Sequence, residues 1–100
     1  MQNYLNEKVL IRTNRAGVFF GTLSNYDDAT RTAEITNTRR IYYWDGAASL
    51  SQMATEGVTN PEACKFTVTV PQMMVMEVIE IIPCSDKAII SIESVKIWKI

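Results

Sequence analysis

Polar and apolar residues alternate in the first part of the chain, and this alternation predicts strands. Residues 8–13 have the pattern of a strand covered on one face, with β-branched side chains. Asn14 and Gly17 tolerate the positive φ of a tight turn, after which residues 18–23 resume the pattern. Gly21 would relieve crowding at a sharp bend or bulge. We therefore predict a hairpin at the start of the chain.

The middle of the chain predicts a loop, two strands and a short helix. Residues 25–31 are polar and predict the loop, and the strands are predicted over residues 32–36 and 39–44. Residues 49–57 predict a helix of about two turns. Ser49 can cap the amide of Gln52, and Gly57 can end this helix in a left-handed conformation.

The last part of the chain predicts three more strands and a second helix. Strands are predicted over residues 65–70, ended by Pro71, over residues 75–82, ended by Pro83, and over residues 96–98. Ser85 would cap a helix that runs to about residue 94. Short strands, tight turns and two short helices indicate an α+β fold that is mainly β, a strongly bent antiparallel sheet or a small barrel.

Size and charge limit what this chain can be. At 100 residues and 47% hydrophobic content it predicts a single domain over residues 1–100 with one core. Ten basic and eleven acidic residues give no basic face for duplex DNA. The start of the chain lacks the pattern of a signal peptide, and the longest apolar stretch is broken by Glu77 and Glu80. We expect a cytoplasmic protein that is neither exported nor inserted into a membrane.

The residue types disfavour an enzyme. The chain has no histidine, so neither a Ser-His-Asp triad nor a Cys-His pair can form. Cys64 and Cys84 are too few soft ligands for zinc and are expected to be buried reduced thiols. We therefore expect no catalytic residue, no metal site and no cofactor, and a protein that binds rather than transforms its ligand.

One strand combines positive charge with aromatic rings. If residues 39–44 are extended, Arg40, Tyr42 and Trp44 project from one face and Ile41 and Tyr43 from the other. A guanidinium beside two rings suits a nucleobase that carries a phosphate. The equal alternative is that the rings belong to the core while the arginine reaches solvent.

Small residues follow this strand where a helix is predicted to begin. Gly46, Ala47 and Ser49, preceded by Asp45, would let an anion approach free helix amides, although a tight strand-to-helix turn is the commoner reason for such residues. Arg15 at the hairpin tip is a further candidate, with a solvated turn arginine as the alternative. The candidate binding residues are Arg15, Arg39, Arg40, Tyr42, Trp44, Asp45, Gly46, Ala47 and Ser49.

Methionines cluster later in the chain. Met73, Met74 and Met76 could form an adaptable binding surface, although filling gaps in a core is the commoner role of methionine.

Several segments resemble a family of short proteins from phage and prophage genomes. They are residues 12–13, 16–21, 39–52, 64–66, 77–84 and 95–98. The chain is also similar to phage anti-defence proteins that sequester nucleotide signals, the Thoeris anti-defence sponges. This resemblance implies a homo-oligomer in the cytoplasm of an infected bacterial cell. It would enclose a cyclic ADP-ribose isomer or a cyclic oligonucleotide, with Arg39 or Arg40 on phosphate and Tyr42 or Trp44 on a base.

Two alternatives stay open. Residues 9–11, Gly17, 21–23 and 26–27 resemble the strand–glycine–strand rhythm of Sm-like RNA-binding barrels, which would bind single-stranded nucleic acid. A structural or protein-interaction module of a phage would instead place Trp44 and Trp98 in protein interfaces. The leading hypothesis is a non-catalytic protein that captures a nucleotide-derived immune signal.

Overall fold

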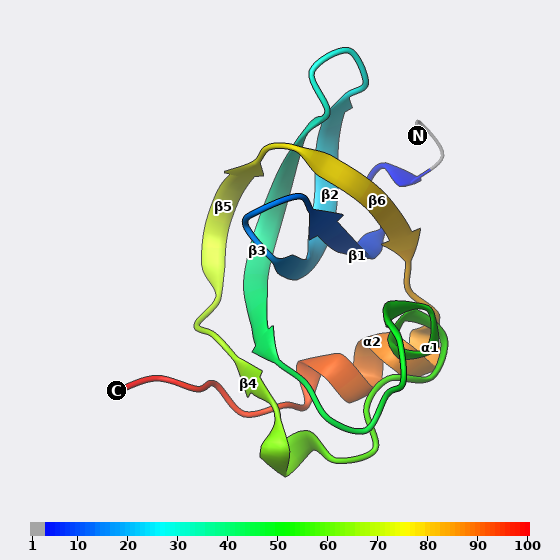
Figure 1. Cartoon of the computed structure of the whole chain (residues 1–100), viewed down its shortest axis with the longest axis vertical. Helices are drawn as coiled ribbons and strands as arrows, with labels where there is room; N and C mark the ends of the chain where they lie inside the picture. Colours follow the sequence, from blue (N-terminus) through cyan, green and yellow to red (C-terminus); the bar gives the residue numbers. More distant parts are fainter. Residues whose placement is uncertain (1–3) are drawn as a thin grey trace.

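The computed structural model describes residues 4–100 and has an α+β fold that is mainly antiparallel sheet (Figure 1). The prediction of the fold class is therefore confirmed. The strands are β1 (Lys8–Thr13), β2 (Val18–Asp27), β3 (Thr32–Tyr43), β4 (Lys65–Phe66), β5 (Val70–Val75) and β6 (Val78–Pro83). The helices are α1 (Leu50–Glu56), the short 3-10 helix η2 (Pro61–Ala63) and α2 (Asp86–Glu93).

The sheet is strongly curved, and the short connection between β5 and β6 links its two sides. Its strand order is β4-β3-β2-β1-β6, and β5 pairs with β3 as well. Strands β5 and β6 follow each other directly, with only Met76 and Glu77 between them. Because β5 pairs with β3 and β6 pairs with β1, this joint connects the two sides of the β3-β2-β1 part of the sheet. The sheet is therefore bent into the shape of a small barrel.

Two hydrophobic clusters lie on the two faces of this sheet. One is built from strand residues such as Phe19, Ile35 and Val75. The other packs residues such as Phe20, the sequence neighbour of Phe19, and Ile41 against α1 and α2. Figure 1 shows both helices together at one end of the sheet, with the β2–β3 turn and the β5–β6 joint at the other. Strand alternation in β2 thus supplies both clusters.

The predicted hairpin and the predicted helix ends are confirmed. β1 pairs with β2 around a turn in which Gly17 has φ 97°. The prediction that this first strand is covered on one face is wrong, because Leu10 lies in one hydrophobic cluster while Val9 and Ile11 lie in the other. The Ser49 hydroxyl accepts a hydrogen bond from the Gln52 amide, and Gly57 ends α1 with φ 82°. The Ser85 hydroxyl caps α2 in the same way, by accepting from the Ala88 amide.

The predicted break between residues 36 and 39 is wrong, because β3 runs without interruption from Thr32 to Tyr43. Between Phe20 and Thr22 the pairing with β3 shifts by one residue, and Asn37 takes a φ of 50° there. The polar residues therefore mark a bulge within one strand rather than a loop. The predicted loop at residues 25–31 is also too long, since β2 continues to Asp27.

The strand ends predicted from the prolines differ from the structure as well. Pro71 lies inside β5, between residues that pair with Thr38 and Thr36, and an edge strand tolerates its missing N–H. The strand predicted over residues 75–82 is interrupted at Glu77, which has φ 56°. The strand predicted over residues 96–98 is reduced to one parallel bridge between Ile97 and Phe66.

Two further findings concern the part of the chain that the structure describes. Within residues 4–100, no helix is long and apolar enough to cross a membrane. In the same range, no three side chains from histidine, cysteine, aspartate and glutamate gather where they could hold a metal ion. Both cysteines are free. Cys64 is buried as expected, whereas Cys84 is only half-buried.

Candidate functional site

A groove beside the β1–β2 turn brings together two arginines that are far apart in the sequence. Its volume is about 580 Å³. Arg15 comes from the turn, Arg40 comes from β3, and the opposite wall is the end of β5 with the β5–β6 joint. We call it the Arg–Met groove, lined by Arg15, Ala16, Phe19, Arg40, Met73, Met74, Val75, Met76 and Glu77.

Strand pairing positions Arg40 in this groove. Phe19 of β2 lies opposite Arg40 in the ladder, and the guanidinium carbon of Arg40 lies 4.9 Å from the centroid of the Phe19 ring. The ring is fully buried while Arg40 is exposed, so the arginine rests on the core and keeps its donors available. Arg40 forms no ion pair with any carboxylate among residues 4–100.

The hairpin tip is held in a defined conformation, which positions Arg15. The Thr13 hydroxyl accepts a hydrogen bond from the Ala16 amide and donates one to the Gly17 carbonyl oxygen. The Asn14 amide donates to the Glu77 carbonyl oxygen, which ties the tip to the β5–β6 joint. The Arg15 guanidinium lies 3.5 Å from the Glu77 carboxylate.

The methionines supply the apolar part of the groove. Met74 and Met76 are 56% and 60% exposed, so the binding-surface interpretation fits them better than the core interpretation does. Met73 is half-buried and packs against the cluster that contains Phe19. Flexible thioether side chains can adapt to a flat ligand.

Arg39 has a different position from its neighbour Arg40. Its guanidinium is buried and donates to four backbone carbonyl oxygens, those of Thr67, Ile92, Phe66 and Lys96. Burial lowers the pKa of Arg39. Its donors are engaged within the protein, so of the two arginines only Arg40 is placed to contact a ligand.

The prediction that Arg40, Tyr42 and Trp44 project together is wrong for Trp44. Trp44 packs against the helix-side cluster, and its indole N–H donates to the Ala47 carbonyl oxygen at 3.2 Å. Arg40 lies instead over Phe19, which belongs to the other cluster. The alternation fails because β3 ends at Tyr43 and its pairing with β4 shifts after Ile41.

Tyr42 makes an aromatic pair with the C-terminal segment. Its ring stacks on that of Trp98 at 4.9 Å between centroids and 17° between planes. Lys65 of β4 places its ammonium 5.4 Å from the Trp98 ring. Tyr42 therefore lies outside the Arg–Met groove, in a second aromatic and cationic cluster.

The small residues after β3 form a tight strand-to-helix turn. The Gly46 carbonyl oxygen accepts from the Thr59 amide and hydroxyl, and a Cβ at Gly46 would lie 2.5 Å from the Thr59 nitrogen. The Ala48 amide donates to the Gln52 side chain, and the Asp45 carboxylate accepts from that of Asn60. These contacts favour the turn interpretation of Asp45, Gly46, Ala47 and Ser49 over the anion site.

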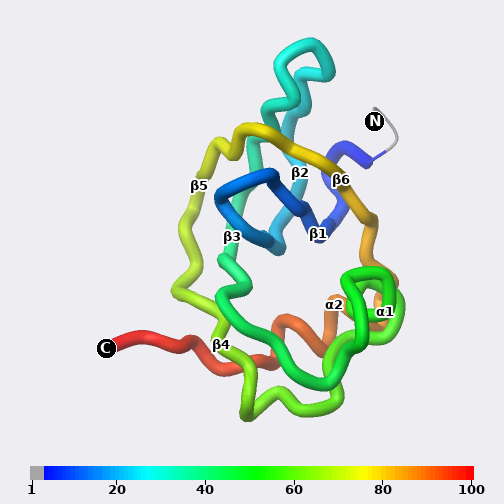
Figure 2. Tube along the Cα trace, in the orientation of Figure 1, coloured from blue at the N-terminus to red at the C-terminus, as the bar shows by residue number. Residues whose placement is uncertain are grey.

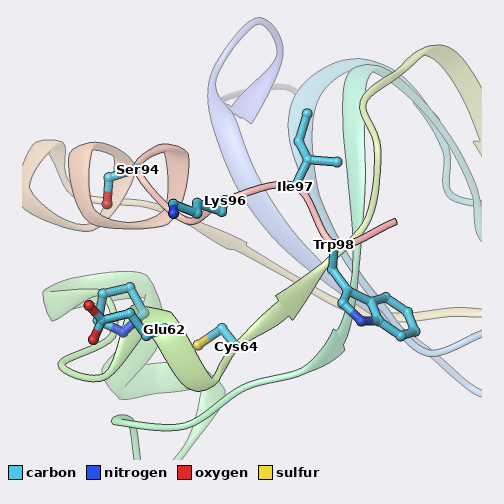
Figure 3. Close-up of a pocket in the computed structure, with 7 residues that line it drawn as sticks. Glu62, Cys64, Ser94, Lys96, Ile97 and Trp98 are labelled. Atoms are coloured by element: carbon cyan, nitrogen blue, oxygen red, sulfur yellow. The ribbon is translucent and has the colours of Figure 1, made fainter. Parts of the chain in front are cut away.

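A second hollow lies between η2 and the C-terminal segment (Figure 3). Its volume is about 420 Å³. Figure 3 shows Glu62 and Cys64 on one side, the Lys96 backbone on the other, and the side chains of Ile97 and Trp98 pointing in opposite directions. It contains none of the nine predicted binding residues, and it combines Glu62 with a buried thiol rather than with arginines.

Sequence reasoning missed four members of the Arg–Met groove, Ala16, Phe19, Val75 and Glu77, of which Phe19 and Glu77 carry the argument. Phe19 has the pattern of an ordinary core residue, and only the ladder reveals that Arg40 lies over it. Glu77 lies in a segment predicted as strand, and the available signal was its polar side chain between two apolar runs.

The fold and the groove define a class: a small, mainly antiparallel β-protein with a cationic and apolar groove beside its first hairpin. The chain belongs to the family described as a domain of unknown function, DUF6948, which matches residues 6–92. This range includes every residue of the Arg–Met groove. No curated protein matches the chain.

Proposed function

We propose that the Arg–Met groove binds a nucleotide-derived ligand without transforming it. The observation that carries this proposal is the convergence of Arg15, Arg40 and the exposed methionines on one groove of about 580 Å³. Small-molecule sites in proteins have volumes of this order and combine apolar walls with a few polar groups.

The two parts of the groove suit the two parts of a nucleotide. A guanidinium with free donors pairs with phosphate oxygens in a charge-assisted, bidentate geometry. The thioethers of Met74 and Met76 offer polarisable contacts for the face of a base. Arg40 is already supported by the Phe19 ring, so little ordering is needed when the phosphate binds.

The biological role that we propose is sequestration of a nucleotide immune signal by a phage protein in the cytoplasm of an infected bacterium. The resemblance to the Thoeris anti-defence sponges supports this part, together with the absence of histidine from the sequence. In this role the protein holds a cyclic ADP-ribose isomer or a cyclic oligonucleotide and releases it intact.

Calorimetry of the wild type and of Arg40→Met tests the proposal. The wild type is expected to bind at least one probe among cyclic AMP, cyclic di-AMP, cyclic di-GMP and cyclic ADP-ribose, and mass spectrometry of the heated complex is expected to recover it unchanged. Arg40→Met should weaken binding about tenfold or more, because a phosphate loses a charge-assisted partner. Lys87→Met, an exposed change on α2 outside the groove, is the matched control.

Three results would contradict the proposal. They are that no probe binds, that the ligand is recovered cleaved, or that Arg40→Met and Lys87→Met bind the ligand equally well.

A second candidate function rests on the Tyr42–Trp98 pair. The two rings are 64% and 45% exposed, and Lys65 lies beside them, which is the composition of a stacking platform for single-stranded nucleic acid. Oligonucleotide binding that weakens steeply with salt and is lost in Trp98→Ala, but not in Arg40→Met, would favour this candidate over the groove.

A further inference from the structure

A hollow on the other side of Glu77 adjoins the Arg–Met groove. Its volume is about 490 Å³, and its lining includes Asn14, Thr30, Arg31 and Ile79 as well as Glu77. Glu77 lines both spaces, and Asn14 and Arg15 are consecutive residues of the hairpin tip. The two hollows are therefore neighbours that share Glu77 in their lining.

The hairpin tip, the β2–β3 turn and the β5–β6 joint meet at this point. The last two each hold a charged residue at a positive φ, which costs backbone free energy. Arg31 ends the β2–β3 turn with φ 54°, and Glu77 forms the β5–β6 joint with φ 56°. The Val78 amide donates to the Arg31 carbonyl oxygen, which binds these two segments to each other. Figure 2 shows both segments at the end of the molecule away from the helices.

Glycine or asparagine would occupy these φ values at lower cost. A long charged side chain at each position, beside two hollows, indicates that the side chains themselves are useful.

The charges around Glu77 are unbalanced. Arg15, Arg31 and Arg40 line the two hollows, and Glu77 is the one acidic side chain that lines either of them. Glu77 pairs with Arg15 through side chains that are 48% and 80% exposed, and ion pairs of this exposure are weak. Neither Arg31 nor Arg40 pairs with a carboxylate of residues 4–100.

We propose that the two hollows form one site for a nucleotide derivative with two separate anionic groups, one at Arg40 and Arg15 and the other at Arg31. This inference rests on the proposed function of the Arg–Met groove. Glu77 acts as an internal competitor that holds Arg15 until an anionic group of the ligand replaces it.

Probes with one and with two phosphodiesters separate this inference from the function itself. Cyclic di-AMP and cyclic di-GMP carry two phosphodiesters, whereas cyclic AMP and cyclic GMP carry one with the same bases. Their affinities are to be measured by calorimetry for the wild type and for Arg31→Gln, Glu77→Gln and Arg40→Gln, with Lys87→Gln as the control. Circular dichroism confirms that each variant is folded.

Arg31→Gln is expected to weaken binding of the two cyclic dinucleotides about fivefold, the effect of about 1 kcal/mol from one exposed ion pair, and to leave the cyclic mononucleotides unchanged. Glu77→Gln is expected to tighten binding of all probes, because it removes the competitor of the ligand for Arg15. Arg31→Gly should repeat the loss for cyclic dinucleotides while raising the melting temperature, because glycine relieves the positive φ.

Each other result has a distinct meaning. If Arg31→Gln matches the wild type on every probe while Arg40→Gln loses binding, the two-anion site is overturned and the groove function stands. If Glu77→Gln weakens binding, Glu77 is a ligand contact and the competitor role is overturned. If the wild type binds no probe, both proposals are overturned.

Discussion

Neighbouring residues of one type have opposite surroundings in this protein. Arg39 is buried and Arg40 is exposed, although they are adjacent in β3 and have the same side chain. Strand alternation requires them to face opposite sides of the sheet, and packing decides which side is covered by helices.

Cys84 gives a prediction at this scale. Burial raises the pKa of its thiol to about 12 from an ordinary value of 9.0, and a backbone hydrogen bond with Leu10 opposes this only in part. The folded-state pKa lies above the unfolded-state pKa, so this contribution to stability is complete below about pH 9 and is lost as the pH rises toward 12.

Thermal unfolding followed from pH 8 to 11 checks this expectation, with Cys84→Ala as the comparison. The wild type should lose melting temperature faster than the variant above pH 9, because only its unfolded chain can ionise a thiol at position 84. A constant difference between the two proteins across this range would contradict it.

At the scale of the elements, Arg39 connects parts that are distant in the sequence. From β3 its guanidinium reaches the carbonyl oxygens of Phe66 in β4, Ile92 in α2 and Lys96 in the C-terminal segment. Its side chain also lies over the Phe66 ring, with 5.4 Å between the guanidinium carbon and the ring centroid. Arg39 thus holds the short strand β4 and the C-terminal end of α2 against the sheet.

Arg39→Ala is therefore expected to lower the free energy of unfolding by about 3 kcal/mol, because buried carbonyl oxygens lose charged donors. Urea unfolding measures this loss. Arg40→Ala is the matched control and should change stability by less than about 1 kcal/mol, since its donors face solvent. Equal losses in the two variants would show that Arg39 does not connect these elements.

The bulge in β3 depends on close contact with β2. An added Cβ at Gly21 would lie 2.9 Å from the Thr38 hydroxyl and 3.0 Å from the Thr36 carbonyl oxygen. Gly21 therefore allows the two strands to approach where the extra residue of β3 is accommodated. The bend or bulge predicted at Gly21 is therefore a bulge, in which the extra residue belongs to β3.

The molecule as a whole exposes several large apolar side chains outside the groove. Tyr42, Ile97 and Trp98 surround the end of β3 and the C-terminal segment, and each is at least 45% exposed. Aromatic residues at this exposure are typical of protein interfaces. We expect this surface to mediate homo-oligomer formation, as in the proposed sequestering role.

Light scattering coupled to gel filtration checks this expectation. The wild type should have a mass above that of one 11.3 kDa chain, and Trp98→Ala should shift the distribution toward the monomer. Lys87→Ala, on the exposed face of α2, serves as the control. A monomeric wild type at all concentrations would contradict the expectation, and the groove would then have to bind its ligand within a single chain.

The sequence by itself determined the fold class, the first hairpin and the ends of both helices. These features depend on local rules: β-branched residues in β1, a positive φ at Gly17 and hydroxyl caps at Ser49 and Ser85. The sequence also identified Arg15 and Arg40 as binding candidates, and these two line the same groove.

Only the tertiary structure decided which candidates lie together. Arg15, Arg40 and Glu77 meet because β1 pairs with β6, β2 pairs with β3, and β3 pairs with β5. Trp44 is separated from Arg40 because β3 ends at Tyr43, and Tyr42 stacks on Trp98 outside the groove. The side-chain pattern of a segment reflects the two-residue period of a strand. The register between distant strands depends instead on packing across the whole sheet.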